Sequence, residues 1–376
     1  MDIQPSATLA ISTLIKEKKA RGEEVFDLGV GEIIGIPSPE VLDFVKNKLT
    51  EPSAWQYPAI LGSKELREAA ADWSNQEYQT SYSAQNVLVT AGGKFAIFIL
   101  LQSLLRAGEE VLIPVPYWVS YPEIVKLFGG APKFILTTRE NEWKIIVEDL
   151  EKLWTPQTKI LILNNISNPA GVIYDESELK KILDWATSKN IIVISDEVYS
   201  SLVFDSQQKF FSGGAIETKG QIIIVQSCSK NFAMSGWRVG FIFGNTGVIK
   251  MASVIQSQSI TALAAIKSRI NIQKNIRSQV VKRRDELVKS LADYCDLKIT
   301  APSAGLYLFI SLKELGIKHN DSVSFAQEFL DQSNVAVVPG KAFGVEGYIR
   351  LSFGGPETEI REGIKRLALF IKNLNQ

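Results

Sequence analysis

Short apolar runs recur through the first two thirds of the chain, and segments of helical length separate most of them. The runs are three to five residues long and rich in Ile and Val, which is typical of strands buried on both faces. They cover residues 87–90, 111–113, 159–163, 191–194, 222–225 and 240–243. One separating segment, Glu176 to Ser188, predicts a helix. This alternation predicts an α/β unit with a largely parallel sheet covered by helices on both sides.

The last third of the chain has a different pattern. A long segment from about Ala262 to Ala292, rich in Lys, Arg and Gln, predicts a long helix that leads to a second unit. In that unit we expect strands at 306–310, 335–338 and 348–353 and a closing helix after Pro356. The expected domains are a large one over 35–278, a small C-terminal one over 279–376, and an N-terminal arm over 1–34 that forms part of the small domain.

Composition narrows the classes of function. The 41 basic and 41 acidic residues leave no net charge, which favours neither a nucleic-acid footprint nor a polybasic membrane patch. The most apolar stretch, Phe95 to Leu105, is too short to span a bilayer. Cys228 and Cys295 make no disulfide framework and Met1 to Pro5 resembles no secretory signal, so we expect a cytoplasmic protein. The single histidine, His319, supports neither a metal site nor a histidine triad.

Two short islands near the middle of the chain carry candidate chemistry. Asp196 and Tyr199 follow one apolar run, and the segment 227–230, which ends in Lys230, follows the next, with Arg238 a little beyond. Because ligands bind at the carboxyl ends of parallel strands, both islands can face one crevice. A carboxylate, a phenol, hydroxyls, an arginine and an amine able to form a Schiff base are what a pyridoxal phosphate site requires.

Each island also has an ordinary structural interpretation. A Ser-Lys pair such as Ser229-Lys230 is usually a solvated turn, and Asp196-Glu197 after a strand is commonly a helix N-cap. Their joint occurrence, in this order and at strand ends, favours the chemical interpretation.

The segment SCSKNFAMSGWRVG, residues 227–240, resembles the lysine signature of class I aminotransferases, which are fold-type I pyridoxal phosphate enzymes. It is similar in particular to the bacterial and archaeal aspartate aminotransferase subgroup, which includes prephenate and aromatic specificities. The likeness runs from Pro5-Ser6-Ala7-Thr8 to the strand 348–353. It implies a large domain with a mostly parallel seven-stranded sheet, a smaller α+β domain, and a homodimer with shared active sites.

The resemblance assigns roles around pyridoxal 5′-phosphate. Lys230 is the Schiff-base amine and moves the proton during transamination, while Asp196 keeps the ring nitrogen protonated. Tyr199 and Asn168 donate to the 3′ oxygen of the ring, and Trp118 stacks on it. Catalysis is therefore expected to rest on Lys230, Asp196 and Tyr199.

The resemblance also implies a phosphate cup. Its members are Gly93 and Lys94 of the Ala91-Gly92-Gly93-Lys94 turn, Ser227, Ser229 and Arg238, with Tyr57 reaching it from a partner subunit. Small residues at a helix start let backbone amides approach an anion, and an arginine can contact it in a bidentate way. The alternative for the glycine turn is a plain connection between a strand and a helix.

The expected substrates are an amino acid and a 2-oxo acid. Arg350 corresponds to the arginine that binds the substrate α-carboxylate, with Gly31, Trp118 and Asn168 beside it. Independently, an arginine in a strand of Tyr, Ile, Leu and Phe is costly without an anionic partner. Lys94 matches a lysine that recognises the distal carboxylate of dicarboxylic substrates.

The specificity stays open at this point. The loop after Gly31-Glu32 reads Ile33-Ile34-Gly35-Ile36, where relatives have a polar sequence, and this apolar surface also suits aromatic substrates. We expect transfer from aspartate or glutamate to 2-oxoglutarate by a ping-pong route. The alternatives are an aromatic or other aminotransferase and a lyase or cyclase on the same scaffold. A ligand sensor derived from this fold would carry a DNA-binding domain ahead of it, whereas the likeness starts almost at Met1.

Overall fold

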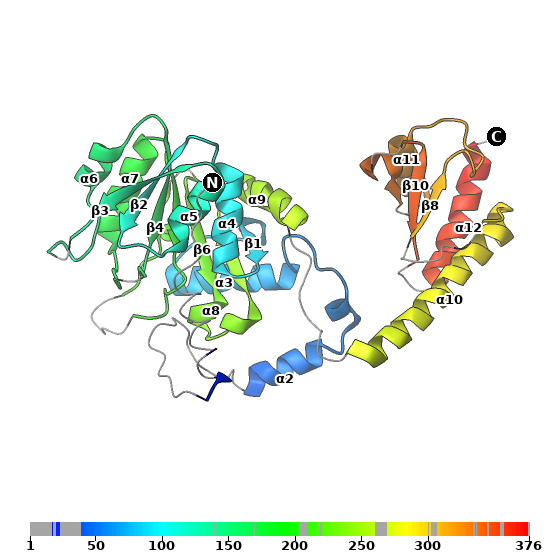
Figure 1. Cartoon of the computed structure of the whole chain (residues 1–376), viewed down its shortest axis with the longest axis horizontal. Helices are drawn as coiled ribbons and strands as arrows, with labels where there is room; N and C mark the ends of the chain where they lie inside the picture. Colours follow the sequence, from blue (N-terminus) through cyan, green and yellow to red (C-terminus); the bar gives the residue numbers. More distant parts are fainter. Residues whose placement is uncertain are drawn as a thin grey trace. The chain divides into compact units, whose positions relative to one another are not determined.

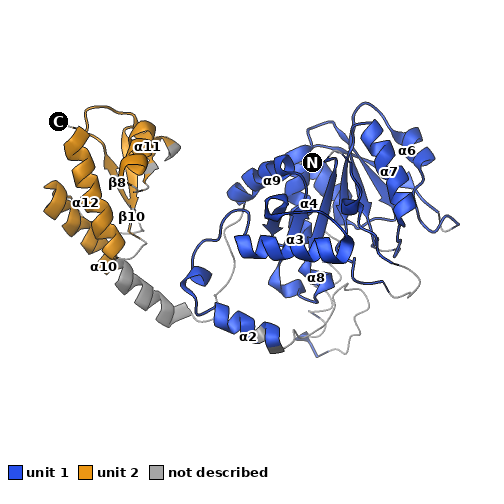
Figure 2. Ribbon diagram, turned by 180° about the vertical axis from the view of Figure 1, so that it is seen from behind, with its two compact units in different colours: residues 1–262 blue, residues 263–376 orange. Residues whose placement is uncertain are grey.

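The structure, a computed structural model, divides into two compact units, Met1–Ala262 and Leu263–Gln376 (Figure 2). It describes residues 17, 20–22, 39–138, 140–168, 170–203, 209–218, 220–259, 269–299, 301, 307–333, 335, 337–343, 346–353 and 357–374. Most of the expected N-terminal arm lies outside these residues. The domain bounds expected from the sequence stay a prediction.

Unit 1 contains a seven-stranded sheet in the order β1-β7-β6-β5-β4-β2-β3 (Figure 1). The strands are β1 Val87–Thr90, β2 Glu110–Val115, β3 Ala131–Leu136, β4 Thr158–Asn164, β5 Ile192–Asp196, β6 Ile222–Ser227 and β7 Gly240–Phe243. β7 runs antiparallel to β1 and β6, and the other four pairings are parallel. The predicted mostly parallel seven-stranded sheet is confirmed.

The sheet is covered on both faces. The described helices of unit 1 are α2 Pro39–Lys48, α3 Lys64–Tyr78, α4 Gly93–Leu104, α5 Ser120–Leu127, α6 Val147–Leu153, α7 Glu176–Ser188, α8 Cys228–Asn231 and α9 Thr246–Ser259. Along β6, Ile222 and Ile224 join a core with α3, α6 and α7, whereas Ile223 and Val225 join a second core with α4, α5 and α9. Burial on both faces explains why the strands read as continuous apolar runs.

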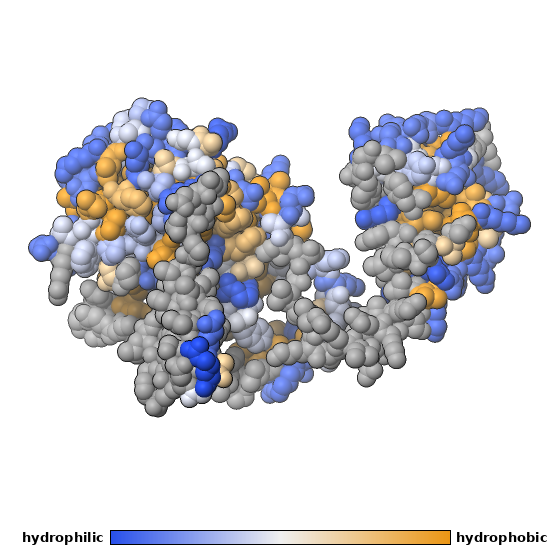
Figure 3. Space-filling model, viewed as in Figure 1, coloured by the Kyte–Doolittle hydropathy of each residue, from blue (hydrophilic) through white to orange (hydrophobic). Residues whose placement is uncertain are grey.

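The edge strand β3 is the one strand of this sheet that the apolar pattern misses. Its sequence Ala-Pro-Lys-Phe-Ile-Leu alternates in burial, and Phe134 and Leu136 are exposed by 38% and 77%. Figure 3 shows hydrophobic residues at the surface on the side of unit 1 where β3 lies. An edge strand lacks a second neighbour, and here only Ile135 is fully buried, so the apolar part of β3 is confined to Phe134-Ile135-Leu136, after Pro132 and Lys133.

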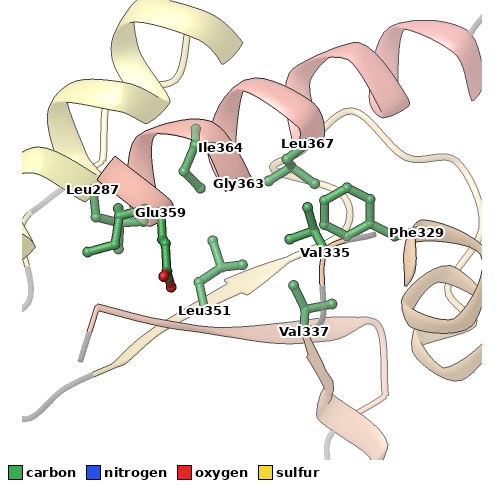
Figure 4. Close-up of a pocket in the computed structure, with 10 residues that line it drawn as sticks. Leu287, Phe329, Val335, Val337, Leu351, Glu359, Gly363, Ile364 and Leu367 are labelled. Atoms are coloured by element: carbon green, nitrogen blue, oxygen red, sulfur yellow. The ribbon is translucent and has the colours of Figure 1, made fainter. Parts of the chain in front are cut away.

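Unit 2 is a three-stranded antiparallel sheet, in the order β8-β10-β9, packed with three helices. Its elements are α10 Arg269–Cys295, β8 Tyr307–Ser311, α11 Ser322–Ser333, β9 Val338–Pro339, β10 Tyr348–Ser352 and α12 Glu357–Leu374. The strand expected at 335–338 is only the two residues of β9 among those described. A cavity of about 210 Å³ lies beside α12 and is lined by apolar side chains and Glu359 (Figure 4).

Short 3₁₀ segments complete the described elements. They are η1 Pro52–Trp55, η2 Ala84–Asn86, η3 Gly213–Ala215, η4 Ser235–Trp237 and η5 Gly340–Phe343. None of the helices in the described parts of the chain is long and apolar enough to cross a membrane.

Candidate active site

The candidate site lies at the carboxyl ends of the parallel strands of unit 1. In the register of the sheet, Asn164 at the end of β4 pairs with Asp196 at the end of β5, and Asp196 pairs with Val225 of β6. β6 ends at Ser227, and the single turn of α8 that follows it carries Lys230, so both residues lie at this end of the sheet. Chain segments more than 60 residues apart thus meet at the carboxyl-terminal end of the sheet, as the sequence predicts for an α/β ligand site.

Asp196 is a buried carboxylate with one strong hydrogen bond. The hydroxyl of Tyr121 donates to its Oδ2 at 2.6 Å, whereas its Oδ1 receives a long contact of 3.4 Å from the backbone N of Val198. Burial raises the pKa of Asp196 to about 6, and the bond from Tyr121 acts in the opposite direction. Oδ1 is therefore the oxygen that can engage a further donor.

Lys230, Tyr199 and Asn168 are close together. The Nζ of Lys230 lies 6.0 Å from the centroid of the Tyr199 ring. The Nδ2 of Asn168 donates to the hydroxyl of Tyr199 at 3.4 Å, and burial raises the pKa of that phenol. The backbone N of Asn168 donates to Oδ1 of Asn164 at 2.7 Å, so the end of β4 orients this residue.

The start of α4 forms a cradle with donors around it. Gly92 precedes the helix with φ +90°, and no side chain caps the helix, so amides of the first turn face outward. A Cβ on Gly92 would lie 2.3 Å from Nη2 of Arg238, and a Cβ on Gly240 would lie 2.6 Å from the carbonyl carbon of Gly92. Gly240 requires glycine because backbone atoms of Gly92 and Gly93 approach it so closely, and Gly92 requires it because of its positive φ.

Two serines and two cations complete this cradle. The hydroxyls of Ser227 and Ser229 are 3.0 Å apart, and the guanidinium of Arg238 donates to the carbonyls of Ala91 and Ser235. Burial and the charge of Arg238 lower the pKa of Lys94. A cluster of hydroxyls, cations and helix-start amides has the donor chemistry that a phosphate dianion needs. The residues present fit a phosphorylated cofactor.

Lys94 also contacts the aromatic residue predicted to cover the cofactor. Its Nζ lies 5.0 Å from the centroid of the Trp118 ring, and that ring packs edge-on against Tyr121 at 5.2 Å. The ammonium group is thus held by a cation–π contact on the site side of α4.

Three predicted site residues are not brought to this place by the described structure. Gly31 lies outside the described residues, as do Ile33, Ile34 and Ile36. Arg350 lies on β10 of unit 2, where it pairs in register with Phe309. Tyr57 follows η1 in unit 1 and is 83% exposed. The roles expected for these residues stay predictions.

Sequence reasoning missed the contact of Tyr121 with Asp196 and the buried hydrogen bonds of Glu197. Tyr121 stands three residues after Trp118, but nothing in the sequence links it to a carboxylate 75 residues away. Glu197 is fully buried and accepts hydrogen bonds from Ser195 and Ser212 hydroxyls and from the backbone N of Gly213, and burial raises its pKa to about 7. The helix N-cap interpretation of Asp196-Glu197 is wrong, because β5 is followed by turns at 198–201.

Other chemistry has little support in the described residues. They contain no group of three or more His, Cys, Asp and Glu that could hold a metal ion. Cys228 and Cys295 are free thiols, and burial raises the pKa of each to about 11. At neutral pH such thiols are not ionised, so neither is an activated nucleophile.

Comparison with known proteins agrees with this geometry. The family model described as "Aminotransferase class I and II" matches residues 23–367. A probable aspartate/prephenate aminotransferase from Aquifex aeolicus is 32% identical over 97% of this chain and 95% of its own length. The solved aspartate aminotransferase from Thermus thermophilus with maleate is 31% identical, with a TM-score of 0.66, over 98% of this chain and 97% of its own.

A second solved structure has a different specificity in its name. The aromatic aminotransferase from Pyrococcus horikoshii is 29% identical, with a TM-score of 0.61, over 96% of this chain and 99% of its own. The family model, the relatives matched over almost their whole length and the site at the carboxyl ends of the strands all indicate the same family. The chain belongs to the class I and II aminotransferase family.

Proposed function

We propose that this aminotransferase acts with pyridoxal phosphate held in unit 1, and that it transfers an amino group from an acidic L-amino acid to a 2-oxo acid. The observation that carries the proposal is that a buried carboxylate, Asp196, and the neighbouring side chains of Lys230 and Tyr199 lie at the carboxyl ends of the adjacent strands β5 and β6. When bound, pyridoxal phosphate supplies an electron sink that makes the α-proton of the amino acid acidic. The chain's own residues have to bind, orient and move that proton.

Asp196 is suited to hold a proton on the ring nitrogen of the cofactor. Tyr121 occupies its Oδ2, which leaves Oδ1 for the ring nitrogen. An ionised carboxylate at this point stabilises a protonated ring nitrogen, and the buried setting strengthens their attraction. Tyr199, with Asn168 beside its hydroxyl, would donate to the 3′ oxygen of the ring.

Lys230 is the group that would move the proton. It directly follows Ser229 of the cradle, its Nζ lies 6.0 Å from the centroid of the Tyr199 ring, and β6, the strand before it, pairs with the strand that carries Asp196. An amine placed beside the α carbon of the substrate can take up the proton from that carbon and would pass it to C4′ of the bound cofactor. The cradle formed by Gly93, Ser227, Ser229 and Arg238 would hold the phosphate and keep the ring in place.

The preference for an acidic substrate rests on Lys94. Its ammonium group lies on Trp118, beside the predicted position of the cofactor ring, where it can attract a distal carboxylate. The Thermus thermophilus relative was solved with maleate, a dicarboxylate, which agrees with this choice. We propose aspartate or glutamate as donor, 2-oxoglutarate as acceptor, and Arg350 with the backbone near Gly31 for the α-carboxylate.

Transfer from aromatic amino acids is the second candidate. The specificity named for the Pyrococcus horikoshii relative supports it, as does the apolar sequence Ile33-Ile34-Gly35-Ile36. The ordering of the two candidates depends on whether Lys94 or this loop dominates the pocket.

A homodimer is part of the proposal. Trp55 and Tyr57 are exposed by 73% and 83%, and Phe44 on α2 by 62%, so large apolar surface is concentrated in the segment 41–60. Such surface marks an interaction site more often than a free one. We propose that a second copy covers it and receives Tyr57 at its phosphate. A cytoplasmic location stays a prediction.

The test uses the purified holoenzyme and a panel of amino acids, with each half-reaction followed by the visible absorbance of the cofactor. Aspartate and glutamate should convert the cofactor faster than phenylalanine and tyrosine. Reduction with borohydride should then fix the cofactor to the peptide that contains Lys230. A label on another lysine would show that the site is misassigned, and faster conversion by aromatic amino acids would make the second candidate the function.

A further inference from the structure

The side chain of Asn231, the residue after Lys230, uses all of its hydrogen-bonding positions. Its Oδ1 accepts from the backbone N of Ser201 at 3.2 Å and from the Oγ of Ser201 at 2.9 Å. Its Nδ2 donates to the Oγ of Ser200 at 3.1 Å and to Oε1 of Gln226 at 2.9 Å. A carboxamide has two donor and two acceptor positions, so this side chain is saturated within unit 1.

The partners of Asn231 are themselves held firmly. Ser200 and Gln226 are buried, and the hydroxyl of Ser200 donates to Oε1 of Gln226 at 3.2 Å. Ser200 is also 2.8 Å from the hydroxyl of Tyr78 on α3. Gln226 belongs to β6 in the middle of the sheet. Asn231 is therefore connected directly to a central strand and to the turn that contains Tyr199, and through Ser200 to α3.

Lys230 depends on such an anchor because its own element is very short. α8 is a single turn of four residues, and a helix of that length is not stable by itself. Asn231 ties the end of this turn to Ser200, which directly follows Tyr199. The side chains of Lys230 and Tyr199 face each other. Asn231 follows Lys230 in sequence and Ser200 follows Tyr199, so the Asn231–Ser200 hydrogen bond joins the backbone segments that carry both side chains.

We propose that Asn231 is a positioning residue that sets the place of the Lys230 amine against Tyr199 and the cofactor. The inference rests on the proposed function in taking Lys230 as the amine that condenses with pyridoxal phosphate. In that condensation the neutral Lys230 amine forms a C=N bond between Nζ and the aldehyde carbon, and the aldehyde oxygen leaves as water with the two hydrogens of the amine. A misplacement of about 1 Å at a reacting atom can slow such a step on the order of 10²-fold.

The test compares Asn231→Leu with a matched control. Asn86→Leu also removes a partly buried carboxamide, whose Nδ2 donates to the carbonyl of Gly244 and whose Oδ1 accepts from Ser83. Asn86 precedes β1, at the end of the sheet opposite the site. Both variants lose several hydrogen bonds, so both should lower the midpoint of thermal unfolding.

Two measured rates distinguish a positioning role of Asn231 from a general loss of protein stability. One is the growth of visible absorbance when the apoenzyme is mixed with pyridoxal phosphate, and the other is kcat with the preferred amino acid. We expect Asn231→Leu to slow both on the order of 10–100-fold, with KM little changed, and Asn86→Leu to leave both at the wild-type value. If Asn231→Leu fails to fold, Asn231→Ala takes its place with the same expected direction.

The outcomes are distinguishable. Wild-type rates of cofactor attachment and turnover in the Asn231 variant, at any unfolding temperature, would overturn the inference and leave the proposed function intact. Equal slowing in the Asn86 control would also overturn the inference, because the lower rates would then result from reduced stability and not from a misplaced Lys230. A wild-type chain that attaches no cofactor would overturn both proposals.

Discussion

The hydrogen bond from Tyr121 to Asp196 lets us predict how the pKa of this carboxyl changes when the bond is removed. Tyr121→Phe removes one buried hydroxyl and leaves the ring in place. A hydrogen bond to a charged group contributes about 1.5–3 kcal/mol, and one pKa unit corresponds to about 1.4 kcal/mol. Because the lost donor favours the ionised carboxylate, its removal should raise the pKa of Asp196 from about 6 to roughly 7–8.

The raised pKa has a consequence for cofactor binding that depends on pH. The ring nitrogen needs the ionised carboxylate, and near pH 7 the ionised fraction should fall from about 90% to about 10–50% in the apoenzyme. The affinity for pyridoxal phosphate should therefore weaken by about 2–10-fold near pH 7 and by about 10–100-fold near pH 5. Near pH 9 the two proteins should bind alike, because Asp196 is ionised in both.

The assay is a fluorescence titration of apoenzyme with pyridoxal phosphate at these three pH values. Tyr174→Phe is the matched control, since the buried hydroxyl of Tyr174 accepts from the backbone N of Ile145 at 3.0 Å and does not touch Asp196. The control should show the wild-type pH dependence even if it lowers stability. A Tyr121→Phe protein whose affinity differs from wild type by the same factor at every pH would refute the reasoning, because the loss would then be unrelated to ionisation of Asp196.

Three further predictions concern the roles of single residues. Lys94→Ala should lower the ratio of kcat/KM for aspartate over phenylalanine by roughly 10–150-fold, as expected for a lost charge-assisted contact of about 1.5–3 kcal/mol; an unchanged ratio would remove Lys94 from the specificity determinants. Asp196→Ala should reduce kcat on the order of 10²–10³-fold, since removal of one partner of a buried charged pair costs roughly 3–5 kcal/mol, and near-normal turnover would rule out its pairing with the ring nitrogen. Mixing an inactive Tyr57 variant with an inactive Lys230 variant should restore partial activity through heterodimers with one intact site, and no recovery in confirmed heterodimers would mean that each site is built within one chain.

The sequence by itself determined the class of fold and the family. Six of the seven strands of unit 1 carry apolar runs, because a strand with helices on both faces needs apolar side chains on both. The lysine segment 227–240 identifies the aminotransferase family, since its chemistry is concentrated in one short stretch. The strand β3 was not predicted, because at this edge of the sheet only Ile135 is fully buried and the first half of the strand contains Pro132 and Lys133.

Only the tertiary structure decided which side chains support the predicted site. Tyr121 and Asp196 are brought together because β4 lies between β2 and β5, so the helix that follows β2 reaches the end of β5. Asn231 meets Ser200 because β6 pairs with β5 in a fixed register. These contacts join segments that are far apart in sequence. A sequence pattern records whether each residue is apolar or polar, whereas the order and register of the strands decide which polar groups become partners.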